Sequence, residues 1–198
     1  MTSRIVVLAS GSGTLLQALI DAPDPAFEIV GVLSDRADAA ALGRAEAAGI
    51  TASVVAAGEF SDRATWDNAL ADALREHGPD WVVCAGFMRI LGAPILETFA
   101  GRIVNSHPAL LPAFPGAHGV ASALDYGVKL TGCTVHLVDA GVDTGPILAQ
   151  ESVAIEPDDD EASLHERIKT IERRLLLDIV NDLCRFGCTV SGRKVTIP

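Results

Sequence analysis

Short apolar runs rich in Val and Ile alternate with helical patterns through the first half of this 198-residue chain. The runs that predict strands are 4–9, 28–33, 52–55, 80–85 and 102–106, and helical patterns cover 15–21, 39–48, 63–77 and 94–100. Near-continuous apolar strands separated by helices of this length are typical of a parallel sheet covered on both faces. Because strand–helix–strand crossovers are right-handed, the pattern predicts a doubly wound, Rossmann-like half.

The pattern changes after residue 115. A short helix is expected over 118–126, followed by strands over 131–138 and 146–155, whose short connection favours antiparallel or mixed pairing. Apolar residues at helical spacing predict one long helix over 161–186, and the last ten residues are expected to form a small hairpin. We interpret residues 1–198 as a single α/β domain. Its Rossmann-like half is 1–100, and the half 101–198 adds an antiparallel strand and a long C-terminal helix.

The composition excludes several classes of function. A net charge of −11 argues against a nucleic-acid partner, which would need a clustered basic surface. No apolar run approaches the roughly 20 residues of a membrane span, and the first ten residues predict a strand rather than a secretory signal. We therefore expect a cytoplasmic protein without a membrane partner. The four cysteines (Cys84, Cys133, Cys184 and Cys188) do not form a zinc set and are interpreted as structural thiols, so no metal is expected.

The segment Ser10-Gly11-Ser12-Gly13-Thr14 follows the first predicted strand and opens the first helix. Glycines allow a tight turn in which amides at the helix N-terminus converge on an anion. Leu16 stands where the dinucleotide fingerprint has its third glycine, and no GK[ST] follows, so a P-loop is excluded. A monophosphate suits this turn better than a pyrophosphate, although a turn that binds nothing remains an alternative.

Three further segments follow predicted strands. The first, 86–91, reads GFMRIL; core packing is the favoured interpretation of its apolar residues, and the wall of a pocket for a flat heterocycle is the alternative. The second, 104–119, reads VNSHPALLPAFPGAHG, and its prolines stiffen the loop after the fifth strand. The third is the turn-rich loop 139–146. Of the five histidines, His107 is best placed to form an acid–base pair with a loop carboxylate, whereas His118 or His136 could support it.

These segments together resemble a known family. The stretches ASGSGTLLQAL, AGFMRIL, VNSHPALLPAFPGAHG and TGCTVHLVDAGVDTGPILAQ are similar to the phosphoribosylglycinamide formyltransferases, folate-dependent enzymes of purine synthesis, over essentially the full length. The resemblance implies the formyltransferase fold. It also implies transfer of a formyl group from 10-formyltetrahydrofolate to the amine of glycinamide ribonucleotide, with no metal. The oligomeric state is left open, a homodimer included.

The resemblance also implies roles for individual residues. Asn105 and His107 would meet the tetrahedral oxyanion, and Asp143 would position and polarise the histidine or a relaying water. The residues implied for the ribonucleotide are Gly13, Thr14, Leu15, Lys169 and Glu172, with Glu172 taking the amine. Those implied for the folate are Arg63, Met88, Arg89, Ile90, Leu91, Asn105, Val138, Asp139, Ala140, Gly141, Val142 and Asp143.

Two departures and three alternatives accompany this interpretation. Many members carry Ser-Asn at Thr14-Leu15, so a side-chain amide contact to the sugar is in doubt. Many also carry a Lys where this chain has Ala113, a departure with a less obvious consequence. Methionyl-tRNA formyltransferase shares the folate motifs but needs a basic RNA face and a further C-terminal domain, which disfavours it here. A formyltetrahydrofolate deformylase would use water in place of the amine, and it normally carries an N-terminal regulatory domain. A non-catalytic Rossmann-type nucleotide-binding module is the alternative from another class.

Overall fold

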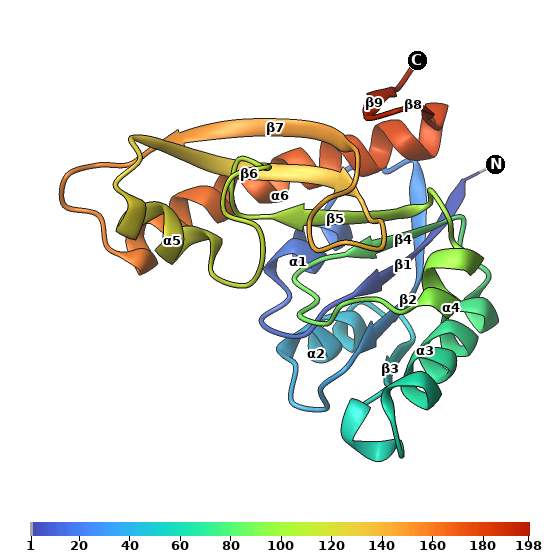
Figure 1. Ribbon diagram of the computed structural model, residues 1–198. Helices are drawn as coiled ribbons and strands as arrows, with labels where there is room; N and C mark the ends of the chain where they lie inside the picture. The colour runs from blue at the N-terminus through green and yellow to red at the C-terminus, as the bar shows by residue number, and fades with distance from the viewer. Residues whose placement is uncertain (1) are drawn as a thin grey trace. The chain divides into compact units, whose positions relative to one another are not determined.

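The computed structural model describes residues 2–198 and contains two compact units, which divide between Asn105 and Ser106. The division falls inside strand β5 (Ile103–His107), and each unit is described by itself. The predicted elements are confirmed, with small differences at their ends (Figure 1). The sequence did not predict the 3-10 helix η1 (Ala57–Glu59). Within residues 2–198, no helix has both the length and the apolar character to cross a membrane.

The first unit is a parallel sheet. Its strands are β1 (Ser3–Leu8), β2 (Phe27–Ser34), β3 (Ala52–Val54), β4 (Trp81–Cys84) and the start of β5, in the order β3-β2-β1-β4-β5. Every neighbouring pair in this order is parallel. The order runs in both directions from β1, as the doubly wound prediction requires.

Four α-helices connect these strands: α1 (Thr14–Ile20), α2 (Ala40–Ala47), α3 (Arg63–His77) and α4 (Ala93–Thr98). Helices α1 and α2 contact each other, as do α3 and α4. Right-handed crossovers that leave β1 in opposite directions place these two pairs on opposite faces of the sheet. The central strands β1 and β4 are therefore buried on both sides, which explains their near-continuous apolar sequences.

The second unit is built on an antiparallel ribbon of β6 (Leu130–Leu137) and β7 (Ile147–Ala154). The C-terminal hairpin of β8 (Thr189–Ser191) and β9 (Lys194–Thr196) adds to it through parallel pairing of β9 with β7. The hairpin was predicted, but its attachment to β7 was not. The remaining helices are α5 (Gly119–Tyr126) and α6 (Glu161–Phe186).

Helix α6 packs along the β6–β7 ribbon (Figure 1). Its apolar stripe buries Leu164 and Ile168 against Cys133 and Val153 of the ribbon. The helix begins at a capping box in which Asp160 and Ser163 satisfy each other's backbone amides. The predicted stripe at helical spacing is thus the contact that fixes α6.

Two of the predicted structural thiols, Cys84 and Cys133, are buried in strands. Burial raises the pKa of each to about 12. Neither forms a reactive thiolate near neutral pH, which confirms their structural interpretation.

Candidate active site

The loop that follows β5 is fastened to the β6–β7 ribbon by two side chains, Thr134 and Gln150. Thr134 Oγ1 accepts a hydrogen bond from the amide of Leu111 (3.0 Å) and donates one to the carbonyl of Ala109 (2.7 Å). Gln150 Nε2 donates to both the Leu111 carbonyl (2.8 Å) and Thr134 Oγ1 (2.9 Å). The proline-stiffened loop is therefore also anchored, and His107 lies at its start.

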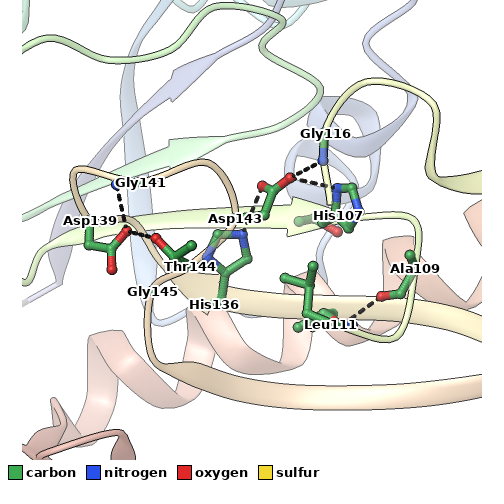
Figure 2. Close-up of polar contacts among 12 residues, drawn as sticks. His107, Ala109, Leu111, Gly116, His136, Asp139, Gly141, Asp143, Thr144 and Gly145 are labelled. Carbon is green, nitrogen blue, oxygen red and sulfur yellow. Dashed lines mark hydrogen bonds and ion pairs between the residues drawn. The ribbon is translucent and has the colours of Figure 1, made fainter. Parts of the chain in front are cut away.

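Asp143 lies between two histidines (Figure 2). Its Oδ2 is 3.4 Å from His107 Nδ1, and its Oδ1 is 3.5 Å from His136 Nε2. The amide of Gly116 donates a further hydrogen bond to Oδ2 at 2.7 Å. The hydrogen bond with His136, followed by the Gly116 amide and the charge of His107, lowers the pKa of Asp143 to about 2 against the opposing effect of burial. The carboxylate is consequently ionised at neutral pH.

The other nitrogen of each ring faces a backbone carbonyl. His107 Nε2 lies 2.8 Å from the Phe114 oxygen, and His136 Nδ1 lies 2.9 Å from the Leu137 oxygen. Because a carbonyl oxygen only accepts, each of these nitrogens carries a hydrogen. The nitrogen of His107 that can exchange a proton is therefore Nδ1, the one that faces Asp143.

Two residues of this site have left-handed backbone. Asp143 (φ 53°) tolerates this conformation because short polar side chains do so, whereas for Phe114 (φ 54°) it is strained. The strain places the Phe114 carbonyl against His107, and such strain persists where the surrounding structure enforces it. Gly145 has a different reason to be glycine, since a Cβ atom there would lie 1.7 Å from the Leu137 oxygen.

The loop before Asp143 is held by its own polar groups. Asp139 Oδ1 accepts hydrogen bonds from the Gly141 amide (3.0 Å) and the Thr144 hydroxyl (2.6 Å), as Figure 2 shows. The side chain of Val142 is exposed. This short loop gives Val138–Asp143 a defined shape while leaving its tip open to a ligand.

Glu172 is a buried carboxyl group on α6. It accepts a 2.6 Å hydrogen bond from the hydroxyl of Ser106, and burial raises its pKa despite this bond. Lys169, one helical turn earlier, pairs with Glu166 at 2.7 Å. Within residues 2–198, Ser106 is the one side chain that hydrogen-bonds this buried carboxyl group. A carboxyl group in this setting is well suited to a ligand amine, which would neutralise its charge.

In the first unit, the glycine turn leads directly into α1. Gly13 has left-handed backbone (φ 70°), and a Cβ atom there would lie 2.7 Å from Ala41 Cα. Arg44 Nε donates to the Ser12 carbonyl at 2.8 Å and so holds the turn in place. The Leu15 side chain is buried, so this residue offers a ligand its amide alone.

The segment after β4 corrects one expectation. Leu91 is buried, but Met88 and Ile90 are 65% and 58% exposed, so the core-packing interpretation is wrong for these two residues. Arg89 Nε donates to Asp35 Oδ2 at 2.8 Å. Arg63 donates from Nε to Asp67 (2.8 Å) and from Nη2 to the Ile90 carbonyl, so it braces the segment from α3. Exposed apolar side chains on a braced segment fit the pocket-wall alternative.

The sequence-predicted residues thus fall into groups. His107 and Asp143 come together in the second unit, as do Ser106 and Glu172, whereas Gly13–Leu15, Arg63 and 88–91 belong to the first unit. Asn105, in the middle of β5, is the register partner of Cys84, the last residue of β4. Sequence analysis named His136 as a possible support for the acid–base pair and gave it no binding or catalytic role. A histidine among the apolar residues of a predicted strand was the available signal.

The fold is an α/β fold, and Asp143 with its two flanking histidines forms a candidate acid–base site. Residues 3–180 match the formyl transferase family, and the chain belongs to that family.

Similarity to individual proteins is extensive. The chain is 55% identical to the phosphoribosylglycinamide formyltransferase of Mycobacterium tuberculosis over 98% of this chain and 91% of that one. It is 43% identical to the trifunctional purine biosynthetic protein adenosine-3 of Drosophila melanogaster over 96% of this chain and 15% of that longer protein. The crystal structure of glycinamide ribonucleotide transformylase 1 from Symbiobacterium toebii superposes with a TM-score of 0.96 at 42% identity, covering 99% of this chain and 94% of that one.

Proposed function

We propose that the protein transfers the formyl group of 10-formyltetrahydrofolate to the amine of N1-(5-phospho-β-D-ribosyl)glycinamide, a step of purine biosynthesis. The observation that carries the proposal is the ionised Asp143 carboxylate between His107 and His136 in a member of the formyl transferase family. The 55% identity to a phosphoribosylglycinamide formyltransferase supports this choice of acceptor.

The substrate amine attacks the formyl carbon, and the formyl oxygen becomes negatively charged in a tetrahedral intermediate. Fixed hydrogen-bond donors at that oxygen lower the barrier. We assign this role to the side chains of Asn105 and His107. They are two residues apart in β5, and alternate residues of a strand project to the same side.

The proton balance requires an acid–base group. The attacking nitrogen loses a proton, N10 of the folate gains one, and the N10–carbon bond breaks as tetrahydrofolate leaves. His107 Nδ1 carries out the exchange, and Asp143 stabilises the charged ring and fixes its orientation. A water between the reacting groups and Asp143 would serve the same transfer over a longer distance.

Family membership and local structure support the binding residues that we propose. The amides of Gly13, Thr14 and Leu15 bind the substrate phosphate. The N–H groups at the start of α1 have no partner within the helix and can donate to an anion. Glu172, with Lys169 nearby on α6, takes the amine end. The folate contacts Arg63, Met88–Leu91, Asn105 and Val138–Asp143. The Arg63 contact is limited to the guanidinium nitrogen that neither Asp67 nor Ile90 uses.

The remaining assignments concern context. The formyl donor acts as a co-substrate, and the chemistry described needs no metal. The partners are these two small molecules, with neither nucleic acid nor a membrane, and the enzyme works in the cytoplasm as a monomer or homodimer.

A formyl-transfer assay tests the proposal directly. Purified protein is given 10-formyltetrahydrofolate with and without glycinamide ribonucleotide, and both tetrahydrofolate and the formylated amine are measured. The proposal requires equal amounts of the two products, formed only when the amine is present. Tetrahydrofolate and formate released at the same rate without the amine would identify a deformylase instead. Absence of any turnover would favour a non-catalytic module.

A further inference from the structure

A buried carboxylate connects the two ligand-binding segments of the first unit. Asp35 follows β2, and its side chain is 2% exposed. Ser10 Oγ, after β1, donates to Asp35 Oδ1 at 2.5 Å, while Arg89 Nε, after β4, donates to Asp35 Oδ2 at 2.8 Å. The amide of Met88 completes the chain by donating to Ser10 Oγ at 2.9 Å. Three strand ends therefore meet at one carboxyl group.

The contacts leave one part of Arg89 uncommitted. Its side chain is 50% exposed, and within residues 2–198 only Nε has a hydrogen bond to the protein. Asp35 thus fixes the guanidinium plane while both terminal nitrogens stay available to an anionic group. A guanidinium oriented in advance loses less conformational entropy when it binds a carboxylate.

The same carboxylate fixes the glycine turn. Ser10 directly precedes Gly11, and its backbone amide also donates to the Gly86 carbonyl at 3.1 Å. A ligand that orders the amides of the turn therefore restrains Ser10, and Ser10 restrains both the Met88 amide and Asp35. Such hydrogen-bond networks carry coupling between sites when both sites bias the same arrangement.

We propose that Asp35 is a positioning residue that orients Arg89 and couples the glycine turn to segment 86–91, so that a phosphate-bearing ligand at the turn strengthens binding of the folate. This inference rests on the proposed function, which assigns these segments to the two substrates. None of the residues with a proposed catalytic role (Asn105, His107 and Asp143) belongs to this network, so the effect should appear in binding.

The test measures coupling with a pair of ligands that cannot react. Tetrahydrofolate is titrated into the protein by calorimetry, without and with saturating glycinamide ribonucleotide, and the ratio of the two dissociation constants is the coupling factor. We expect a factor of roughly 5 in the unaltered protein, at the low end of measured couplings. In Asp35→Asn, the factor should fall to about 1, and tetrahydrofolate alone should bind more weakly because Arg89 loses its partner.

A second variant separates the Ser10–Asp35 contact from the Arg89–Asp35 contact, and a third serves as a control. Ser10→Ala cuts the connections from the turn to Asp35 and to the Met88 amide but keeps the Arg89–Asp35 pair. The coupling should therefore be lost, while tetrahydrofolate alone should bind more tightly than it does to the Asp35→Asn protein. Asp38→Asn is the matched control, because Asp38 pairs with Arg36 in the same loop at 2.8 Å and is exposed. This control should retain both the coupling and the affinity.

The outcomes distinguish the inference from the proposed function. Unaltered protein that binds both ligands with a factor near 1, or Asp35→Asn protein that keeps the unaltered factor, overturns the role of Asp35 and leaves the proposed function standing. Unaltered protein that binds neither ligand overturns the proposed function and this inference with it. Thermal unfolding of each variant verifies that the fold is retained.

Discussion

Asp143 combines a charge with a backbone conformation that few residues adopt. Its φ of 53° suits Asn as well as Asp, so Asp143→Asn changes the charge while leaving the loop in place. We expect kcat to fall by roughly 10²–10⁴, the range of a lost acid–base contribution, because in the proposed mechanism His107 needs this carboxylate for its proton exchange. KM for both substrates should change little, since the loss is confined to the transition state. Steady-state kinetics with each substrate varied in turn would check this.

His118 offers a comparison for that measurement. It begins α5 and is exposed, and no contact with Asp143 is seen among the described residues. His118→Ala should leave kcat within a few-fold of the unaltered value. An Asp143→Asn protein with unaltered kcat would show that Asp143 only shapes its turn.

The charge of Glu172 is expected to lower the stability of the folded protein, although the proposed binding of the substrate amine needs that charge. Its pKa is raised by burial, so the folded protein binds a proton at this site more readily than the unfolded chain does. Stability therefore decreases as the pH rises from the unfolded-state pKa of about 4.3 through the folded-state value. Gln keeps the acceptor for Ser106 and carries no charge.

Glu172→Gln should consequently raise the melting temperature at pH 7.5 and have little effect near pH 4. The same change should weaken glycinamide ribonucleotide binding by roughly 10- to 150-fold, the loss of a charge-assisted hydrogen bond of about 1.5–3 kcal/mol. Tetrahydrofolate affinity should be nearly unchanged. Thermal unfolding at both pH values and calorimetric titration of both ligands provide the measurements. Equal weakening of both ligands would instead indicate a purely structural residue.

At the scale of elements, strand β6 contains two buried threonines, of which one has a hydrogen-bonded hydroxyl group and the other does not. Thr134 bonds the loop that carries His107, whereas the Thr131 hydroxyl has no hydrogen-bond partner among residues 2–198. Val has nearly the shape of Thr without the hydroxyl. Thr134→Val should destabilise the fold by about 1–3 kcal/mol because it leaves buried polar groups unpaired. It should also lower kcat, since the loop loses two of its hydrogen bonds to the ribbon and keeps the one from Gln150.

Thr131→Val is the matched control on the same strand. Removing a buried hydroxyl without a partner should leave stability unchanged or raise it, with unaltered kinetics. Denaturant unfolding and steady-state kinetics of both variants test the pair. Equal effects of the two substitutions would show that the Thr134 hydrogen bonds do not anchor the loop.

The elements themselves were predictable because their signals are local. The strand-to-helix rhythm, the capping residues around Asp160 and the stripe of α6 all lie within short windows of sequence. Pairings between distant residues were less accessible. Strand β9 pairs with β7 through the single residue pair Ile147 and Lys194, which is too short to leave a sequence signal. The contact between His136 and Asp143 depends on the conformation of the 139–146 loop, which brings Asp143 back to β6. Exposure of Met88 and Ile90 could not be read from an apolar sequence that also suits a core.

At the scale of the whole molecule, the two units carry separate spectroscopic signals. Both tryptophans, Trp66 and Trp81, lie in the first unit, whereas Asp143 and both histidines that flank it lie in the second. Each unit has its own buried residues, so unfolding of the chain need not be a single transition. Tryptophan fluorescence reports on the first unit, and far-ultraviolet circular dichroism reports on both.

The pH dependence of unfolding provides the last prediction. Because the pKa of Asp143 is lowered to about 2, its interactions stabilise the folded state fully above the unfolded-state value of about 3.9. That stabilisation is lost as the pH falls through about 2. Urea unfolding followed by circular dichroism should therefore show Asp143→Asn to be less stable than the unaltered protein at pH 7, with the difference shrinking between pH 4 and pH 2. If the units unfold independently, the fluorescence transition should be the same in both proteins. A stability difference that stays constant down to pH 2 would contradict the ionised, histidine-paired state of Asp143.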